Sequence, residues 1–111
     1  MAMTGTEKAQ ESSLPKSETI TICNQQPDTM KRVEVTPNGG RIHFQNKDQE
    51  DYGIRFWKTG MEETSGIDIV LPAGGSITVA IKQDDEFGYR VMLFDNGGKV
   101  STGKGGGPIG N

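Results

Sequence analysis

Apolar and polar residues alternate along most of the chain between residues 18 and 100, and turn-forming residues interrupt the alternation at short intervals. A period of two puts alternate side chains on the same face of a β-strand. No window of this region has the spacing of an amphipathic helix. The pattern therefore predicts an all-β fold, with strands around 20–22, 33–35, 42–44, 52–56, 67–71, 77–81 and 87–93 and a short eighth strand starting at 99–100.

Three glycine-rich segments separate these strands, at 37–40, 72–75 and 95–98. Gly and Asn accept the positive φ angles of tight turns, so the Asn38-Gly39 pair is typical of a simple hairpin. Seven or eight short strands of this kind usually form a sandwich or a small barrel. The inward-facing positions predict a core of Ile20, Ile22, Val33, Val35, Ile42, Phe44, Ile54, Phe56, Ile69, Leu71, Ile77, Val79, Ile81, Phe87, Tyr89 and Val91.

Composition supports this interpretation and sets the expected limits of the domain. Ile and Val number 15 while Leu and Ala together number 7, a balance that favours strands over helices. Residues 1–17 are polar and predict a disordered tail. Residues 101–111 contain five glycines and a proline and predict a flexible tail, which leaves 18–100 as the β-sandwich domain.

Charge and rare residues exclude several classes of function. The net charge of −3 argues against nucleic-acid binding, and no apolar run is long enough for a membrane span. The single Cys excludes an intrachain disulfide, and the single His excludes a metal site with two imidazoles. We expect a cytoplasmic protein by default, or a secreted or periplasmic one if a signal peptide has been removed.

Two parts of the chain together resemble the cupredoxins, the plastocyanin and azurin group. The first comprises 33–46 (VEVTPNGGRIHFQN) and 52–56 (YGIRF), and the second comprises 75–81 (GSITVAI) and 86–91 (EFGYRV). Their order and spacing match that family's strands, and the resemblance covers about residues 33–100. It implies a seven- to eight-stranded Greek-key β-sandwich, in which the turn at 37–40 carries the chain between sheets instead of closing a hairpin.

The same resemblance places the copper ligands of the family at positions that lack them here. The first His would fall at Tyr52, the Cys at Val91 and the second His near Phe94. A blue-copper site needs two imidazoles and a thiolate. The resemblance therefore implies the scaffold only, and we expect no metal and no cofactor.

Other candidate chemistry is sparse. Cys23 and His43 could form a nucleophile and base pair only if the fold brought them together. Acidic runs at 48–51, 62–63 and 84–86 lack the spacing of a calcium loop. The cupredoxin topology places the first of these runs beside the turn at 95–98 and the third at the opposite end.

The outer face of the second sheet offers a candidate binding site. In the family the strands at 52–56 and 87–93 are antiparallel neighbours, and one register sets Gly53 beside Met92, Arg55 beside Arg90, and Trp57 over Gly88. Like charges placed opposite each other destabilise a sheet, so the two arginines need compensation.

Two arrangements could supply that compensation. In the first, a nearby carboxylate (Glu62, Glu63 or Asp68) neutralises the arginines, and Trp57 merely covers bare backbone. In the second, both guanidinium groups hold an acidic group of a protein partner or a small anion, flanked by Trp57 and Met92.

The sequence thus predicts a copper-free, cupredoxin-like binding or interaction module that is not an enzyme. Its candidate partner-binding residues are Arg55, Trp57, Arg90 and Met92, and its oligomeric state is open. The alternatives are a small enzyme or enzyme subunit that uses Cys23 and His43, and a structural component of an assembly.

Overall fold

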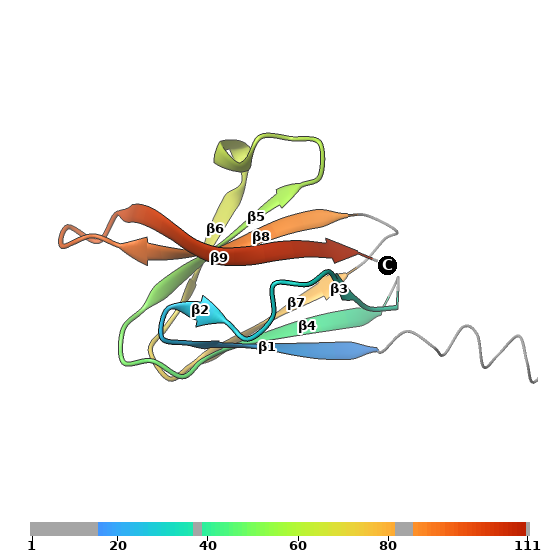
Figure 1. The fold of residues 1–111 in the computed structure, drawn as a ribbon, viewed down its shortest axis with the longest axis horizontal. Helices are drawn as coiled ribbons and strands as arrows, with labels where there is room; N and C mark the ends of the chain where they lie inside the picture. The colour runs from blue at the N-terminus through green and yellow to red at the C-terminus, as the bar shows by residue number, and fades with distance from the viewer. Residues whose placement is uncertain (1–15, 37–38, 82–85, 111) are drawn as a thin grey trace, which may run out of the picture.

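Two β-sheets pack face to face in the computed structural model, which describes residues 16–36, 39–81 and 86–110 (Figure 1). The four-stranded sheet has the order β2 (Gln26–Pro27), β1 (Ser17–Cys23), β4 (Gly40–Asn46) and β7 (Ser76–Ile81). The five-stranded sheet has the order β3 (Val33–Glu34), β9 (Val100–Gly110), β8 (Phe87–Phe94), β5 (Tyr52–Lys58) and β6 (Ile67–Leu71). A short 3₁₀ helix, η1 (Glu63–Ser65), lies between β5 and β6. The predicted β-sandwich is confirmed, but the described residues form nine strands where seven or eight were expected, because Gln26–Pro27 adds a short strand beside β1.

The chain crosses between the sheets where the sequence suggested a simple hairpin. β3 lies in the five-stranded sheet and β4 in the four-stranded sheet, so the turn before Gly40 connects the two layers. The hairpin expected at Asn38-Gly39 is therefore wrong, and the crossing implied by the cupredoxin resemblance is confirmed; Asn38 itself lies outside the described residues. The chain also changes sheet between β2 and β3, between β4 and β5, between β6 and β7, and between β7 and β8.

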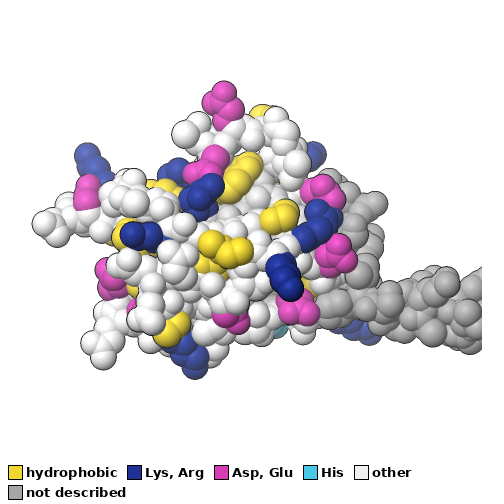
Figure 2. Space-filling model, in the orientation of Figure 1, with side chains coloured by type: hydrophobic (Ala, Val, Ile, Leu, Met, Phe, Trp, Pro, Cys, Tyr) yellow, Lys and Arg dark blue, Asp and Glu magenta, His cyan; other side chains and the backbone are white. Residues whose placement is uncertain are grey.

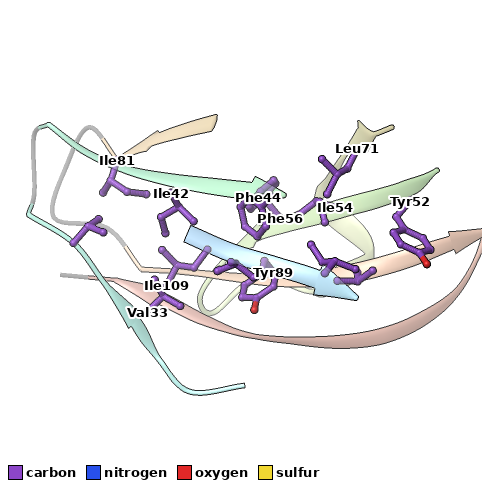
Figure 3. Packing of buried hydrophobic residues seen from close by; sticks show 14 residues of the cluster. Val33, Ile42, Phe44, Tyr52, Ile54, Phe56, Leu71, Ile81, Tyr89 and Ile109 are labelled. Carbon is purple, nitrogen blue, oxygen red and sulfur yellow. The ribbon is translucent and has the colours of Figure 1, made fainter. Parts of the chain in front are cut away.

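The core lies between the two sheets and contains the residues that alternation predicted (Figure 3). The rings of Phe56 and Tyr89 both pack edge-on against Phe44, with centroids 5.6 and 5.3 Å from it. Four members of the predicted core are only partly buried: Ile69, Ile77, Val79 and Phe87. The core also contains Tyr52 and Ile109, which the prediction left out, and Met92 is buried outside the core cluster.

The expected flexible tail at 101–111 is wrong for the residues up to 110. β9 runs from Val100 to Gly110, pairs with β8 along its length, and pairs with β3 through Ile109 and Gly110. Ile109 is 1% exposed and belongs to the core. At the other end, β1 already begins at Ser17, and the rest of the predicted N-terminal tail, residues 1–15, lies outside the described residues.

Close packing explains why β9 is rich in glycine. A Cβ on Gly106 would lie 1.9 Å from the carbonyl oxygen of Tyr89, and a Cβ on Gly105 would lie 2.6 Å from Pro27 Cδ. Glycine is needed there because neighbouring groups occupy the space of a side chain. The same residues that suggest flexibility in the sequence thus fit a tightly packed strand.

Candidate functional site

The outer face of the five-stranded sheet has the register that the sequence analysis proposed. In the antiparallel pair of β5 and β8, Gly53 lies opposite Met92, Arg55 opposite Arg90, and Trp57 opposite Gly88. The two arginines are therefore direct cross-strand neighbours, and the need to compensate their like charges is real.

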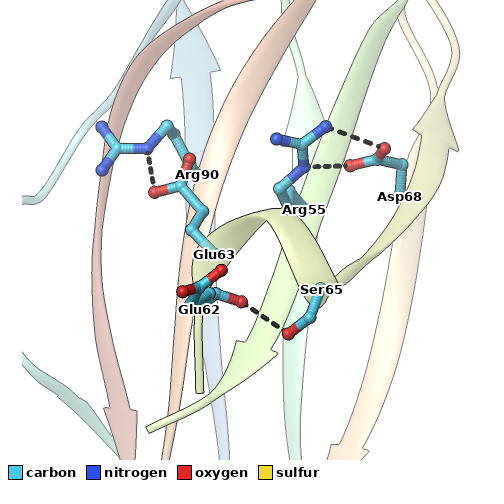
Figure 4. A network of polar contacts seen from close by, with 6 residues as sticks. All are labelled: Arg55, Glu62, Glu63, Ser65, Asp68 and Arg90. Carbon is cyan, nitrogen blue, oxygen red and sulfur yellow. Dashed lines mark hydrogen bonds and ion pairs between the residues drawn. The ribbon is translucent and has the colours of Figure 1, made fainter. Parts of the chain in front are cut away.

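Carboxylates of the same chain supply that compensation (Figure 4). Arg55 donates from Nε and Nη2 to the two oxygens of Asp68, at 2.8 and 3.1 Å, and this pairing raises the pKa of the Arg55 guanidinium. Arg90 donates to Glu63 through Nε alone, at 2.9 Å. The first of the two arrangements left open by the sequence is the one observed, and a single acidic group held by both arginines is not supported.

Glycines let large side chains lie flat on this face. A Cβ on Gly88 would lie 2.4 Å from the Trp57 ring, so the indole covers that stretch of β8 backbone as expected. A Cβ on Gly103 would lie 2.3 Å from Arg90 Cδ, so the aliphatic part of Arg90 extends across β9. These contacts fix where the Trp57 ring and the Arg90 guanidinium lie.

Met92 does not contribute to an exposed site. It points to the outer face as predicted, but it is only 4% exposed. Next to it, the ring of Phe94 lies 3.4 Å from the position of a Cβ on Gly53, which makes this part of the face closely packed. Met92 is therefore removed from the candidate binding residues, and so is Arg55, because Asp68 engages two of its nitrogens.

A shallow groove of about 350 Å³ lies beside the two remaining residues. Trp57, Arg90 and Pro108 contribute side chains to it, and Gly88 and Gly106 contribute bare backbone. Figure 2 shows hydrophobic side chains gathered in the middle of the face formed by β8 and β9, with basic and acidic side chains around them. An indole, a proline and a guanidinium at one groove suit a ligand with an apolar part and an acceptor group.

A second polar cluster closes the end of the sandwich at which the family would hold copper. The Asp48 carboxylate accepts the backbone N–H groups of Asn24 and Gln25, both at 2.9 Å, and the hydroxyl of Tyr52. Asn24 and Gln25 have positive φ angles of 54° and 68°, which turn their N–H groups toward this one carboxylate. Burial and the neighbouring Asp48 raise the pKa of the Tyr52 phenol, so the phenol remains a donor.

The hydrogen bonds at Asp48 predict a loss of stability in acid. The hydroxyl of Tyr52, followed by the Gln25 and Asn24 N–H groups, lowers the pKa of Asp48. A carboxylate whose pKa is lowered by folding stabilises the protein above its unfolded pKa of about 3.9, and this stabilisation is lost as the pH falls through the lower folded value. We expect Asp48→Asn to reduce the difference in unfolding free energy between pH 6 and pH 2.5, measured by urea denaturation.

The matched control is Glu62→Gln, which removes an exposed carboxylate that makes no ion pair among the described residues. It should leave the acid dependence unchanged. An equal acid dependence in the wild type and Asp48→Asn would contradict the prediction.

The residues at the family's ligand positions do not fit a copper site. Tyr52 is buried and donates to Asp48, Val91 is fully buried in the core, and Phe94 offers no donor atom. Within 16–36, 39–81 and 86–110, no group of three or more His, Cys, Asp or Glu side chains is placed to hold a metal ion. The donor set of a blue-copper site is therefore missing from its place in the fold.

Cys23 and His43 are not brought together. β1 and β4 are parallel, with Thr19 opposite His43, so Cys23 lies four residues further along β1, roughly 13 Å away along the strand. His43 Nδ1 instead hydrogen-bonds the hydroxyl of Thr78 at 2.7 Å. The Cys–His pair of the enzyme alternative is contradicted.

The acidic runs lie where the cupredoxin topology places them, as far as they are described. Glu50 and Asp51 line the same cleft as Asp95 and Asn96, so these two loops are adjacent. Glu86 lies at the opposite end of β8 and pairs with Arg32. Asp84 and Asp85 lie outside the described residues.

Comparison with solved structures gives the class of fold. Amicyanin from Paracoccus versutus superposes with a TM-score of 0.60 at 12% sequence identity, over 90% of this chain and 86% of that one. A methionine mutant of amicyanin in its Cu(I) form gives a TM-score of 0.58 at 10% identity, over 89% of this chain and 85% of that one. The protein has a cupredoxin-like fold.

No protein-family model and no curated protein sequence matches the chain. Within the described residues, no helix is long and apolar enough to cross a membrane. Because identity to the amicyanins is so low, the likeness establishes the fold, and the function has to be argued from the site.

Proposed function

We propose that this protein is a copper-free, cupredoxin-like binding module that contacts its partner through the groove beside Trp57 and Arg90. The observation that carries the proposal is the half-buried indole of Trp57, which lies on the Gly88 backbone and lines the groove together with Arg90. Trp and Arg are the residue types most enriched among energetically dominant contacts in interfaces.

Both side chains keep hydrogen-bonding capacity for a partner. Within the described residues, the Trp57 indole N–H has no hydrogen-bond partner, and Arg90 uses only Nε, which leaves both of its terminal nitrogens open. Figure 4 shows these terminal nitrogens on the side away from Arg55. A groove with open donors and an apolar wall suits an acidic segment of a protein partner, or a small carboxylate, that also carries an apolar group.

Affinity capture from native extract tests this function. We expect Trp57→Ala to weaken capture of the partner about tenfold or more, because truncating an aromatic anchor removes a dominant contact. Val70→Ala is the matched control, since Val70 is 56% exposed on the same sheet but does not line the groove. Unchanged thermal unfolding of both variants shows that they fold.

Equal capture by Trp57→Ala and the wild type would place the interaction elsewhere and overturn the proposal. The same conclusion follows if Val70→Ala and Trp57→Ala lose the partner equally.

A further inference from the structure

We propose that Glu63 is an internal competitor at this groove: its carboxylate neutralises the guanidinium of Arg90 through Nε, and a carboxylate of the partner replaces it as the counter-charge. This inference rests on the proposed function and adds the ligand chemistry and its regulation. The two arginine pairs on the outer face differ in how firmly they are held.

The Arg55–Asp68 pair is part of the sheet. Asp68 lies on β6 directly opposite Arg55 on β5, and its two oxygens accept hydrogen bonds from two nitrogens of the Arg55 guanidinium. The Arg55 side chain is 18% exposed. Two hydrogen bonds between directly opposed strand positions hold this pair more firmly than a single contact would, so Arg55 keeps its charge compensated whether or not a ligand is bound.

The Arg90–Glu63 pair is much less constrained. It is a single contact, and the side chains of Arg90 and Glu63 are 38% and 31% exposed. Exposed single ion pairs contribute little to stability because water competes for both partners. A carboxylate that approaches from the groove can therefore displace Glu63 at small cost.

The segment that carries Glu63 is attached to β5 at its two ends, by the hydrogen bond from the Met61 N–H to the Lys58 carbonyl oxygen and by the packing of Gly66 on the Phe56 backbone, and it has few attachments between them. Residues 61–66 include η1, which buries no residue, and Met61 is 59% exposed. The backbone bonds of Ser65 and Gly66 go to Glu62 and Glu63 within the segment itself. Among the described residues, the Glu63–Arg90 bond is the only side-chain hydrogen bond that ties this segment to the sheet.

Charge complementarity identifies the occupant. With Glu63 displaced, Arg90 has an uncompensated positive charge while Arg55 retains Asp68, so the groove gains one net positive charge. The guanidinium then offers Nε as well as its two terminal nitrogens to a carboxylate, and its charge is no longer shared with Glu63, while Trp57 and Pro108 lie beside it for an apolar group. The ligand is thus a carboxylate next to an aromatic or aliphatic group.

Titration with N-acetylphenylalanine tests this inference, with N-acetylphenylalaninamide as the uncharged probe. Binding is followed by NMR at the Trp57 indole N–H and the Arg90 Nε–H of the full chain. We expect the acid to shift both signals and the amide to bind more weakly. Glu63→Gln should tighten binding of the acid by up to about fivefold, the equivalent of one exposed ion pair, and Arg90→Ala should abolish the preference for the acid.

Glu62→Gln is the matched control, because it removes the same charge from the adjacent position and leaves the Arg90 contact intact. Equal tightening in both variants would mean that only general charge repulsion is relieved, which overturns the competitor role. An unchanged affinity in Glu63→Gln, or equal binding of the acid and the amide, overturns it as well. The capture experiment with Trp57→Ala uses the natural partner, so the binding module can be confirmed even where the competitor is refuted.

Discussion

Gly106→Ala is expected to lower the free energy of unfolding by about 1–3 kcal/mol, the range for forcing extra atoms into a closely packed region. The added Cβ would lie 1.9 Å from the carbonyl oxygen of Tyr89 and 2.8 Å from the Cα of Arg90. Both are backbone atoms of β8, so no side-chain rotation relieves the contact. Urea denaturation followed by the fluorescence of the single Trp gives the measurement.

The matched control is Gly97→Ala, in the turn between β8 and β9. Its Cβ would come no closer than 3.4 Å to Asp95, and its φ angle is not positive. We expect a change within about 0.5 kcal/mol, as for ordinary surface positions. If both variants are equally stable, the C-terminal glycines do not pack as the structure describes.

Asn46→Leu is expected to cost about 2–4 kcal/mol of stability. Asn46 is 1% exposed; its amide nitrogen donates to the carbonyl oxygens of Glu50 and Leu71, at 2.9 and 3.2 Å, and its oxygen accepts the Asp48 N–H at 2.9 Å. Leucine has a similar shape and removes all three of these hydrogen bonds. A buried backbone group that loses its hydrogen bond costs about 1–3 kcal/mol of stability. The total is lower than the sum of three such costs because water can reach the partly buried groups.

Gln45→Leu serves as the control, because Gln45 precedes Asn46 on β4 and faces the opposite side of the sheet. It should change the unfolding midpoint little. A stability for Asn46→Leu equal to that of the control would show that the Asn46 bonds contribute nothing net.

Much of the candidate site followed from the register of two strands. Alternation placed Arg55 and Arg90 on the outer face, and the cupredoxin resemblance made β5 and β8 neighbours, so their cross-strand contact could be predicted. The identity of the compensating carboxylates could not. Asp68 follows from the β5–β6 pairing, whereas Glu63 reaches Arg90 only through the path of the irregular segment after β5.

The prediction that Met92 is an exposed binding residue was wrong because, as for Glu63, the outcome depends on tertiary contacts. Its position on the outer face follows from alternation, but its burial depends on the adjacent Phe94 and on how the strands pack over Gly53. A sequence pattern gives the side of a sheet and gives no information on what covers that side.

The sequence by itself determined most of the strands and most of the inward-facing core, because these depend on alternation, and it showed that the positions at which the resemblance places the copper ligands hold other residues. Only the tertiary structure decided the role of 101–110. Glycine permits a flexible chain and equally permits the closest approach of two backbones, and the choice depends on what lies within a few ångströms. The groove beside Trp57 and Arg90 also depends on the tertiary structure, since β9 forms one of its walls.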